Sequence, residues 1–416
     1  MDKVAIVVQR YGKEINGGAE VHARLLAEHL KEKYEVEVLT SCCLDYHNWE
    51  NYYPDGEEVV DGIRVLRFAN ESKNQKAAYR LLRYLRGNWK YYQMQYTLTN
   101  VFTLSFRRFK YRKRKNHDQI FDCWIDGAGP VCKGMISYIE QERDRYKAFI
   151  FFTYLYYPTY FGLQKVPDKS ILIPLAHDEP TFYFSGFGKM FSLPRFIMYN
   201  TESEKQLVES TYPVTQPIRS DIAGVGFDCP ELDKSTIPPV TSPYFVYIGR
   251  IDAGKGCLEL MDYFTKMDKP ELKLVMIGKN LLKHSVKNDN IIFTGFIDEP
   301  EKLAYLQHCQ ALVIPSRYES LSMVTLEAMS VGKPVLANGY CDVLRCHIEQ
   351  SQAGFIYYEG KDFAEQADKI LNMSENDKQF ISQKGNSYVE RNYQWSSIMK
   401  KFDAAIQYVD SNRGSL

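Results

Sequence analysis

Short apolar runs alternate with longer segments of helical spacing along most of the chain. The runs are rich in β-branched and aromatic residues and end at turn signals, a pattern typical of strands buried on both faces of a parallel sheet. The predicted strands of a first series are Val4 to Val8, Val36 to Thr40, Ile63 to Phe68, Ile120 to Ile125, Phe149 to Phe152, Ile171 to Ala176 and Phe196 to Tyr199. Those of a second series are Tyr244 to Ile248, Leu272 to Ile277, Ile291 to Thr294, Ala311 to Ile314, Pro334 to Ala337 and Gly354 to Tyr357. The sequence therefore predicts an α/β protein with two parallel sheets.

Two series of strands predict two doubly wound, Rossmann-like domains in tandem. A chain of 416 residues has the length of two or three domains at the usual ~100 to 200 residues each. Proline residues gather from 228 to 243, where the alternation lapses, and we place the hinge there. We expect a first domain over 1–227, a second over 228–392, and a helix within 393–416 that either caps the second domain or crosses back over the first. Ligands of such sheets bind outside the carboxyl ends of the strands, so two facing domains would enclose a cleft.

The composition is that of a globular protein and excludes several other classes. The 52 basic and 52 acidic residues and the 45% hydrophobic content do not fit a disordered or fibrous chain. The nine cysteines include no CxxC pair, which favours buried thiols in a reducing compartment. No apolar run reaches the roughly 20 residues of a membrane span, and the first run is too short for a signal peptide. We expect a cytoplasmic protein.

Residues 76–118 carry twelve Lys or Arg and one acid, which makes this segment strongly basic. Aromatic side chains interleave with the charges, as in helices that lie on an anionic membrane surface. Contact with the inner face of a membrane is therefore one prediction. The alternative is a solvated helix whose aromatic residues pack on their own domain. We expect no nucleic-acid binding, because no recognisable nucleic-acid module surrounds the segment.

The segment 315–335 has the most chemical content. After a predicted strand and a loop, a helix is expected to open near Ser322. The backbone N–H groups of Ser322, Met323 and Val324 then form a helix N-terminus, which favours a phosphate group.

Two carboxylates, Glu319 in the loop and Glu327 in the second turn of the helix, flank this anion site. Acidic groups beside a phosphate make sense if they bind hydroxyl groups on either side of it, because a carboxylate accepts two hydroxyl hydrogens at once.

A diphosphate also needs positive charge. The chain has no Asp-x-Asp pair and no clustered His or Cys that would hold a metal, so we expect no metal and no other cofactor. Arg250 and Lys255, in the glycine-rich segment 249–256 after the first strand of the second domain, are the candidate cations. Each charge-assisted bond to a phosphate oxygen contributes roughly 1.5 to 3 kcal/mol. On their own, the two residues would be better explained as part of a solvated turn.

These residues together resemble the retaining, nucleotide-sugar-dependent glycosyltransferases of family 4, which have the GT-B architecture of two facing Rossmann-like domains. Glu319 and Glu327 match the two glutamates of that family, separated by seven residues. Arg250 and Lys255 match its basic phosphate pair. The family commonly has Gly where Ser322 stands, which implies a less close backbone approach here.

The resemblance extends to the first domain. Gly17 and Gly18 resemble the family's glycine-rich loop opposite the donor, and His177 resembles its active-site histidine. Taken alone, the glycines are also consistent with a turn from strand to helix, and His177 with a hydrogen-bonded residue at a strand end. Glu20 and Asp178 are interpreted as helix N-terminal acids.

The resemblance implies a role for each residue. Glu327 holds the ribose hydroxyls, and Glu319 contacts the transferred sugar. Arg250 and Lys255 stabilise the departing diphosphate, assisted by the backbone amides of the helix N-terminus. The donor is a nucleotide sugar and the acceptor a glycan or lipid-linked glycan in bacterial-type polysaccharide assembly. Transfer proceeds with retention by front-face attack, without a metal.

Two rival functions remain open on the sequence alone. One is a sugar-nucleotide epimerase or a phosphorylase of the same architecture. The other is a non-catalytic GT-B subunit that partners an active transferase, although the intact set of acidic and basic residues argues against it.

Overall fold

The computed structural model describes residues 1–15, 17–46, 48–71, 76–86, 119–228, 237–282, 286 and 288–411. The chain divides into two compact units. Unit 1 comprises Met1–Val225 and Ile398–Leu416, and unit 2 comprises Gly226–Ser397. Of the predicted basic segment, residues 87–118 lie outside the described residues, as do Asn16 beside the glycine pair and 229–236 of the predicted hinge.

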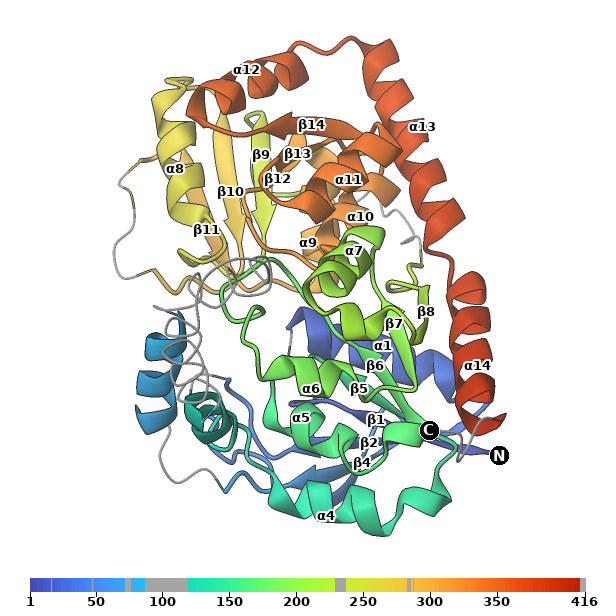
Figure 1. Cartoon of the computed structure of the whole chain (residues 1–416). Helices are drawn as coiled ribbons and strands as arrows, with labels where there is room; N and C mark the ends of the chain where they lie inside the picture. Colours follow the sequence, from blue (N-terminus) through green and yellow to red (C-terminus); the bar gives the residue numbers. More distant parts are fainter. Residues whose placement is uncertain are drawn as a thin grey trace, which may run out of the picture. The chain divides into compact units, whose positions relative to one another are not determined.

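Unit 1 is built on an eight-stranded sheet in the order β3-β4-β2-β1-β5-β6-β7-β8 (Figure 1). The strands are β1 Lys3–Val7, β2 Glu35–Ser41, β3 Gly56–Val60, β4 Ile63–Phe68, β5 Ala148–Phe152, β6 Ser170–Ile173, β7 Phe196–Tyr199 and β8 Arg219–Ile222. All neighbours are parallel except the β3–β4 hairpin. The order reverses between β1 and β5, as in doubly wound sheets. Two edge strands, β3 and β8, were not predicted.

The helices of unit 1 connect these strands. They are α1 Gly18–Leu30, α4 Lys133–Gln141, α5 Tyr157–Leu163, α6 Phe187–Phe191 and α7 Glu202–Thr211, with 3-10 turns at Arg143–Arg145, Pro167–Lys169 and Pro213–Thr215. Residues 76–86 and 119–125 are also helical. The predicted strand from Ile120 to Ile125 is therefore wrong. Phe121, Trp124 and Ile125 are buried at helical spacing, on one face of a turn, rather than alternating as in a strand.

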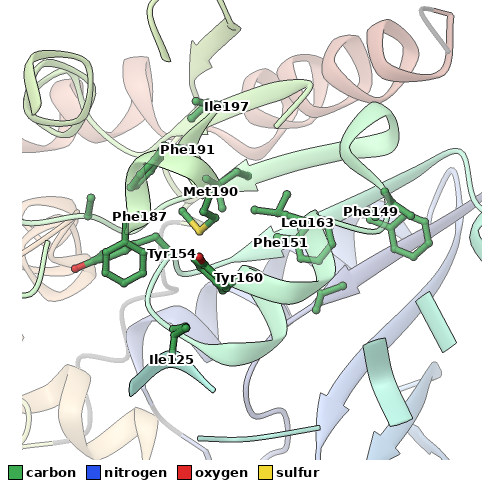
Figure 2. Packing of buried hydrophobic residues seen from close by; sticks show 14 of the residues in the cluster. Ile125, Phe149, Phe151, Tyr154, Tyr160, Leu163, Phe187, Met190, Phe191 and Ile197 are labelled. Atoms are coloured by element: carbon green, nitrogen blue, oxygen red, sulfur yellow. The ribbon is translucent and has the colours of Figure 1, made fainter. Parts of the chain in front are cut away.

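Aromatic side chains fill much of the core between the sheet of unit 1 and its helices. Tyr154, which follows β5, stacks against Phe191 and meets Phe187 edge to face, with centroid distances of 5.9 and 4.9 Å. Figure 2 shows this cluster, in which Phe149 and Phe151 come from β5. Tyr154 is therefore part of the hydrophobic core of unit 1.

Unit 2 contains a six-stranded, fully parallel sheet in the order β11-β10-β9-β12-β13-β14. The strands are β9 Tyr244–Ile248, β10 Lys273–Ile277, β11 Ile291–Gly295, β12 Ala311–Ile314, β13 Val335–Asn338 and β14 Gly354–Tyr357. The helices are α8 Cys257–Lys266, α9 Glu299–His308, α10 Met323–Ser330, α11 Asp342–Ser351, α12 Gly360–Leu371 and α13 Glu375–Asn392. All six strands coincide with predicted ones. The predicted fold class, an α/β protein with two Rossmann-like parallel-sheet domains, is confirmed.

The last helix, α14 Trp395–Ser411, belongs from Ile398 onward to unit 1. Tyr408 lies edge to face with Phe196 of β7 and under the guanidinium of Arg219 of β8, at 4.6 Å from ring centroid to Cζ. Asp403 pairs with Lys33 at 2.8 Å. Figure 1 shows α14, in red, beside β8. The C-terminal helix therefore completes the N-terminal unit.

Candidate active site

Two loops of unit 2 hold most of the predicted donor site, and they follow β9 and β12. The order of the sheet reverses between these two strands, because β9 leads to β10 and β11 on one side and β12 leads to β13 and β14 on the other. In open parallel sheets, ligands bind at the carboxyl ends of the strands at such a switch point. The topology and the sequence motif thus indicate the same edge of the sheet.

The loop after β9 is held against the loop after β12. Gly256 adopts φ +75°, and a Cβ at this position would lie 2.6 Å from the carbonyl oxygen of Pro315. Glycine is required here both for the left-handed conformation and for the close approach. Asp252 Oδ1 accepts the backbone N–H of Lys255 at 2.8 Å, which fixes the turn that carries this lysine.

The structure brings Lys255 and Glu319 together. Lys255 Nζ lies 2.7 Å from Glu319 Oε1, with side-chain exposures of 29% and 16%. Arg250 is more exposed, at 45%, and its Nε lies 3.7 Å from Asp252 Oδ2. The loop after β9 thus presents two cations, Arg250 and Lys255. Lys255 is paired with Glu319, the first glutamate of the sequence motif.

Helix α10 begins at Met323, immediately after Ser322. Ser322 has φ 61° and ψ 71°, the left-handed region that costs a residue with a Cβ roughly 1 kcal/mol or more. This gives a physical reason for the glycine that resembling enzymes commonly have at this position. The Ser322 hydroxyl lies 2.9 Å from Thr325 Oγ1, and the side chain is buried. The N–H groups of Met323 and Val324 lie in the first turn of α10.

His347 of α11 braces the loop that leads into α10. Its Nε2 lies 2.7 Å from the carbonyl oxygen of Leu321, and its Nδ1 lies 2.9 Å from the hydroxyl of Tyr388. Burial lowers the pKa of His347 to about 4, against the opposing effect of the Leu321 carbonyl. The ring is therefore neutral at pH 7. Because a carbonyl only accepts, Nε2–H donates to Leu321 and Nδ1 accepts from Tyr388.

Glu327, in the second turn of α10, pairs with a lysine that the sequence motif did not indicate. Lys302 of α9 places Nζ 2.9 Å from Glu327 Oε2 and 2.6 Å from Glu299 Oε1. The Lys302 and Glu327 side chains are 16% and 19% exposed, whereas Glu299 is 76% exposed. The second glutamate of the motif is therefore anchored to α9.

In unit 1, the glycine pair lies at the start of α1, beside a buried ion pair. Arg10 Nη2 lies 2.5 Å from Glu20 Oε1, and the side-chain amide of Gln9 donates to the same oxygen at 3.0 Å. A Cβ at Gly17 would lie 2.1 Å from Glu20 Oε2, whereas a Cβ at Gly18 would meet no atom within 4 Å. A side chain at Gly17 would therefore displace the Glu20 carboxylate, whereas Gly18 borders open space. Glu20 is indeed in the first helical turn, but it is also paired and buried.

His177 follows β6 and is held in place by a buried carboxylate of α7. Glu204 Oε1 accepts the backbone N–H of Ala176, and Glu204 Oε2 accepts that of Asn200, both at 2.6 Å. Leu175, which lies between the end of β6 and Ala176, has φ 53°, in the left-handed region. Burial raises the pKa of Glu204 to about 8, because the groups that oppose it are neutral backbone amides. The peptide that leads into His177 is therefore held by a hydrogen bond to Glu204, a residue of α7.

The predicted site residues thus fall into two sets. Gly17, Gly18 and His177 lie in unit 1, and the remaining predicted residues lie in unit 2. The sequence interpretation missed Lys302 and the two bracing residues Glu204 and His347. Each contacts a residue of another segment that lies well outside the span of a local motif, so local spacing carried no signal for it.

In the described part of the chain, no helix has the length and apolar character to cross a membrane. The same residues include no group of three or more His, Cys, Asp or Glu side chains arranged to hold a metal ion.

Residues 228–386, which contain both loops and both glutamates, match the family model described as glycosyl transferases group 1. The match covers less than half of the chain. Among curated proteins, sulfoquinovosyl transferase SQD2 of Arabidopsis thaliana is 32% identical over 126 residues, 28% of this chain and 24% of that protein. The O-antigen chain mannosyltransferase C of Escherichia coli is 25% identical over 103 residues, 23% of this chain and 27% of that protein. The chain thus spans about a quarter of the length of these relatives.

Solved structures match along almost the whole chain. Sucrose-phosphate synthase from Thermosynechococcus elongatus has a TM-score of 0.66 at 16% identity and covers 99% of this chain and 100% of its own. HepE from Anabaena, in complex with UDP-glucose, has a TM-score of 0.66 at 14% identity and covers 97% of this chain and 99% of its own. These likenesses show that the chain has the GT-B fold of glycosyltransferases.

Proposed function

We propose that the protein is a retaining glycosyltransferase that moves a sugar from a nucleotide-sugar donor to a glycan or lipid-linked glycan acceptor. The observation that carries this proposal is the contact between Lys255 and Glu319 at the switch point of unit 2. The segment that contains them matches the group 1 glycosyl transferases, and HepE, with the same fold, is described in complex with UDP-glucose. The O-antigen transferase supports a polysaccharide product.

In this proposal the diphosphate of the donor binds to Arg250, Lys255 and the backbone amides of Met323 and Val324, without a metal ion. Negative charge grows on the diphosphate as the glycosidic bond breaks, and fixed positive groups stabilise the transition state more than the ground state. The Lys255 ammonium is already positioned by Glu319 before a donor arrives, so little reorganisation is needed.

Glu319 contacts the transferred sugar and Glu327 binds the ribose hydroxyls. In unit 1, His177 is the proposed active-site histidine, and Gly17 and Gly18 are proposed donor-binding residues. The acceptor attacks the face that the diphosphate leaves, so the diphosphate takes the proton of the acceptor hydroxyl and the configuration is retained.

The first experiment is a screen of UDP-, GDP- and ADP-sugars for slow hydrolysis and for transfer, with the wild-type chain and with Glu319→Gln and Glu327→Gln. We expect turnover of one donor, and losses of about 100-fold or more in both variants, assayed at a temperature at which circular dichroism shows both to be folded. Full activity in both variants would refute the assignments. Conversion of the donor sugar without transfer would instead identify an epimerase, and a requirement for phosphate would identify a phosphorylase.

Metal independence is tested by adding EDTA to the active preparation. Transfer is expected to continue at an unchanged rate, and its loss would show that a divalent ion shares the diphosphate with Arg250 and Lys255.

A further inference from the structure

Lys302 is a largely buried lysine between two helices of unit 2. It lies in the first turn of α9, and its ammonium reaches Glu327 of α10 at 2.9 Å and Glu299 of its own helix at 2.6 Å. The two partners are unequal. Glu299 is 76% exposed, and an ion pair with such a group contributes little in water. Glu327 is 19% exposed, so the contact with Glu327 is the one that solvent screens least.

The charge state of Lys302 is fixed by its surroundings. Burial acts to lower its pKa, but the nearby charges of Glu327 and Glu299 outweigh this effect, and the pKa of Lys302 is raised. Lys302 is therefore an ammonium ion throughout the physiological pH range. Loss of this charge would leave a buried carboxylate oxygen without its counter-ion, which is costly.

The two oxygens of Glu327 have different surroundings. Oε2 is buried and faces the Lys302 ammonium. The side chain as a whole is 19% exposed, so its accessible surface belongs to atoms other than Oε2. A rotation that would exchange the two oxygens must first break the ion pair with Lys302.

We propose that Lys302 is a positioning residue for Glu327, which it holds in one orientation so that the carboxylate can accept the hydroxyl hydrogens of the donor ribose. This inference rests on the proposed function, in which Glu327 binds the ribose. Lys302 touches no part of the donor. Its effect is expected only on the recognition of the ribose hydroxyls.

The experiment compares nucleotides with and without those hydroxyls. Calorimetry measures the Kd of UDP, GDP and ADP for the wild type, and then of the tightest of the three and its 2′,3′-dideoxy form for each variant. Lys302→Met keeps the aliphatic stem and removes the charge, and Lys302→Arg keeps the charge. Lys266→Met is the matched control, because Lys266 forms an exposed ion pair with Asp262 at 2.6 Å on another helix of the same unit.

The wild type is expected to bind the ribonucleotide about 10-fold or more tightly than the dideoxy form, since a bond to a charged group contributes roughly 1.5 kcal/mol or more. In Lys302→Met this preference is expected to fall close to one, through weaker binding of the ribonucleotide alone. Lys302→Arg and Lys266→Met are expected to keep the preference. A role in stability alone would lower the melting temperature of Lys302→Met without changing the preference.

An unchanged preference in Lys302→Met, or an equal loss of affinity for both nucleotides, would overturn the inference while leaving the proposed function intact. Failure of the wild type to bind any of the three nucleotides would refute the proposed function, and the inference with it.

Discussion

The buried carboxylate of Glu204 makes the stability of unit 1 depend on pH in an unusual direction. Its two oxygens accept the backbone N–H groups of Ala176, which precedes His177, and of Asn200, which follows β7, and burial raises its pKa from the ordinary 4.5 to about 8. Between pH 4.5 and about pH 8, Glu204 holds a proton in the folded chain that it releases in the unfolded chain. The stability that this residue contributes is therefore fully present below pH 4.5 and is lost as the pH rises toward 8.

The size of the effect follows from the two pKa values. Each pKa unit corresponds to about 1.4 kcal/mol, so the free energy of unfolding is expected to fall by roughly 2 kcal/mol from pH 4.5 to pH 6, and by about 4 kcal/mol in all at pH 8. Glu204→Gln mimics the protonated acid permanently and keeps one acceptor oxygen. The variant should therefore lose this pH dependence and be more stable than the wild type at pH 8.

The assay is urea unfolding followed by circular dichroism, at intervals from pH 5 to pH 8. Glu202→Gln is the control, because Glu202 lies on the same helix and is exposed. The informative quantity is the difference between each variant and the wild type at each pH, which cancels other titrating groups. If the curves of Glu204→Gln and the wild type run parallel, or if the variant is destabilised more at pH 8 than at pH 5, the carboxylate is ionised in the fold and the reasoning is wrong.

Two further predictions follow from contacts in the site. Gly17→Ala places a Cβ 2.1 Å from Glu20 Oε2 and must displace a carboxylate whose other oxygen is held by Arg10, so a loss of roughly 1–3 kcal/mol in chemical unfolding is expected. Gly18→Ala, which meets no atom within 4 Å, should unfold like the wild type, and equal stabilities of the two variants would contradict the packing argument. Lys255→Met removes the partner of Glu319, and because this pair is partly exposed, the free energy of unfolding should change by about 1 kcal/mol or less. The kcat of transfer is expected to fall roughly 100-fold or more. A kcat within a factor of three of the wild type would show that the ammonium does not stabilise the leaving group.

Strands buried on both faces could be predicted from the sequence because their apolar runs are continuous. The four inner strands of unit 2 and most strands of unit 1 are of this kind, and the edge strands β11 and β14 are partly exposed but still carry short apolar runs. The two missed strands are edge strands with polar or alternating sequences: Gly56–Val60 is mostly exposed, and Arg219–Ile222 contains only one apolar residue. The wrongly predicted strand from Ile120 to Ile125 has the opposite origin, since its apolar residues lie close together but repeat at the period of a helix.

The candidate site shows the same division between local and distant signals. The spacing of Glu319, Ser322 and Glu327 is local, and it indicated the loop and the start of α10 correctly. The contact with Lys255 followed from topology, because two loops at one switch point must meet at the same sheet edge. The Lys302 contact depends on how α9 packs beside α10, and no periodicity encodes that packing.

The return of α14 to unit 1 makes unit 2 an insertion within the other unit. A continuous fragment, 226–397, contains all of unit 2 and can be excised with two cuts. No continuous fragment contains the whole of unit 1, since residues 1–225 lack the ring of Tyr408 that packs on β7 and β8. A chain shortened at its C-terminal end therefore loses part of its N-terminal unit first, and lost transfer in such a truncation would report damage there rather than at Arg250 and Lys255.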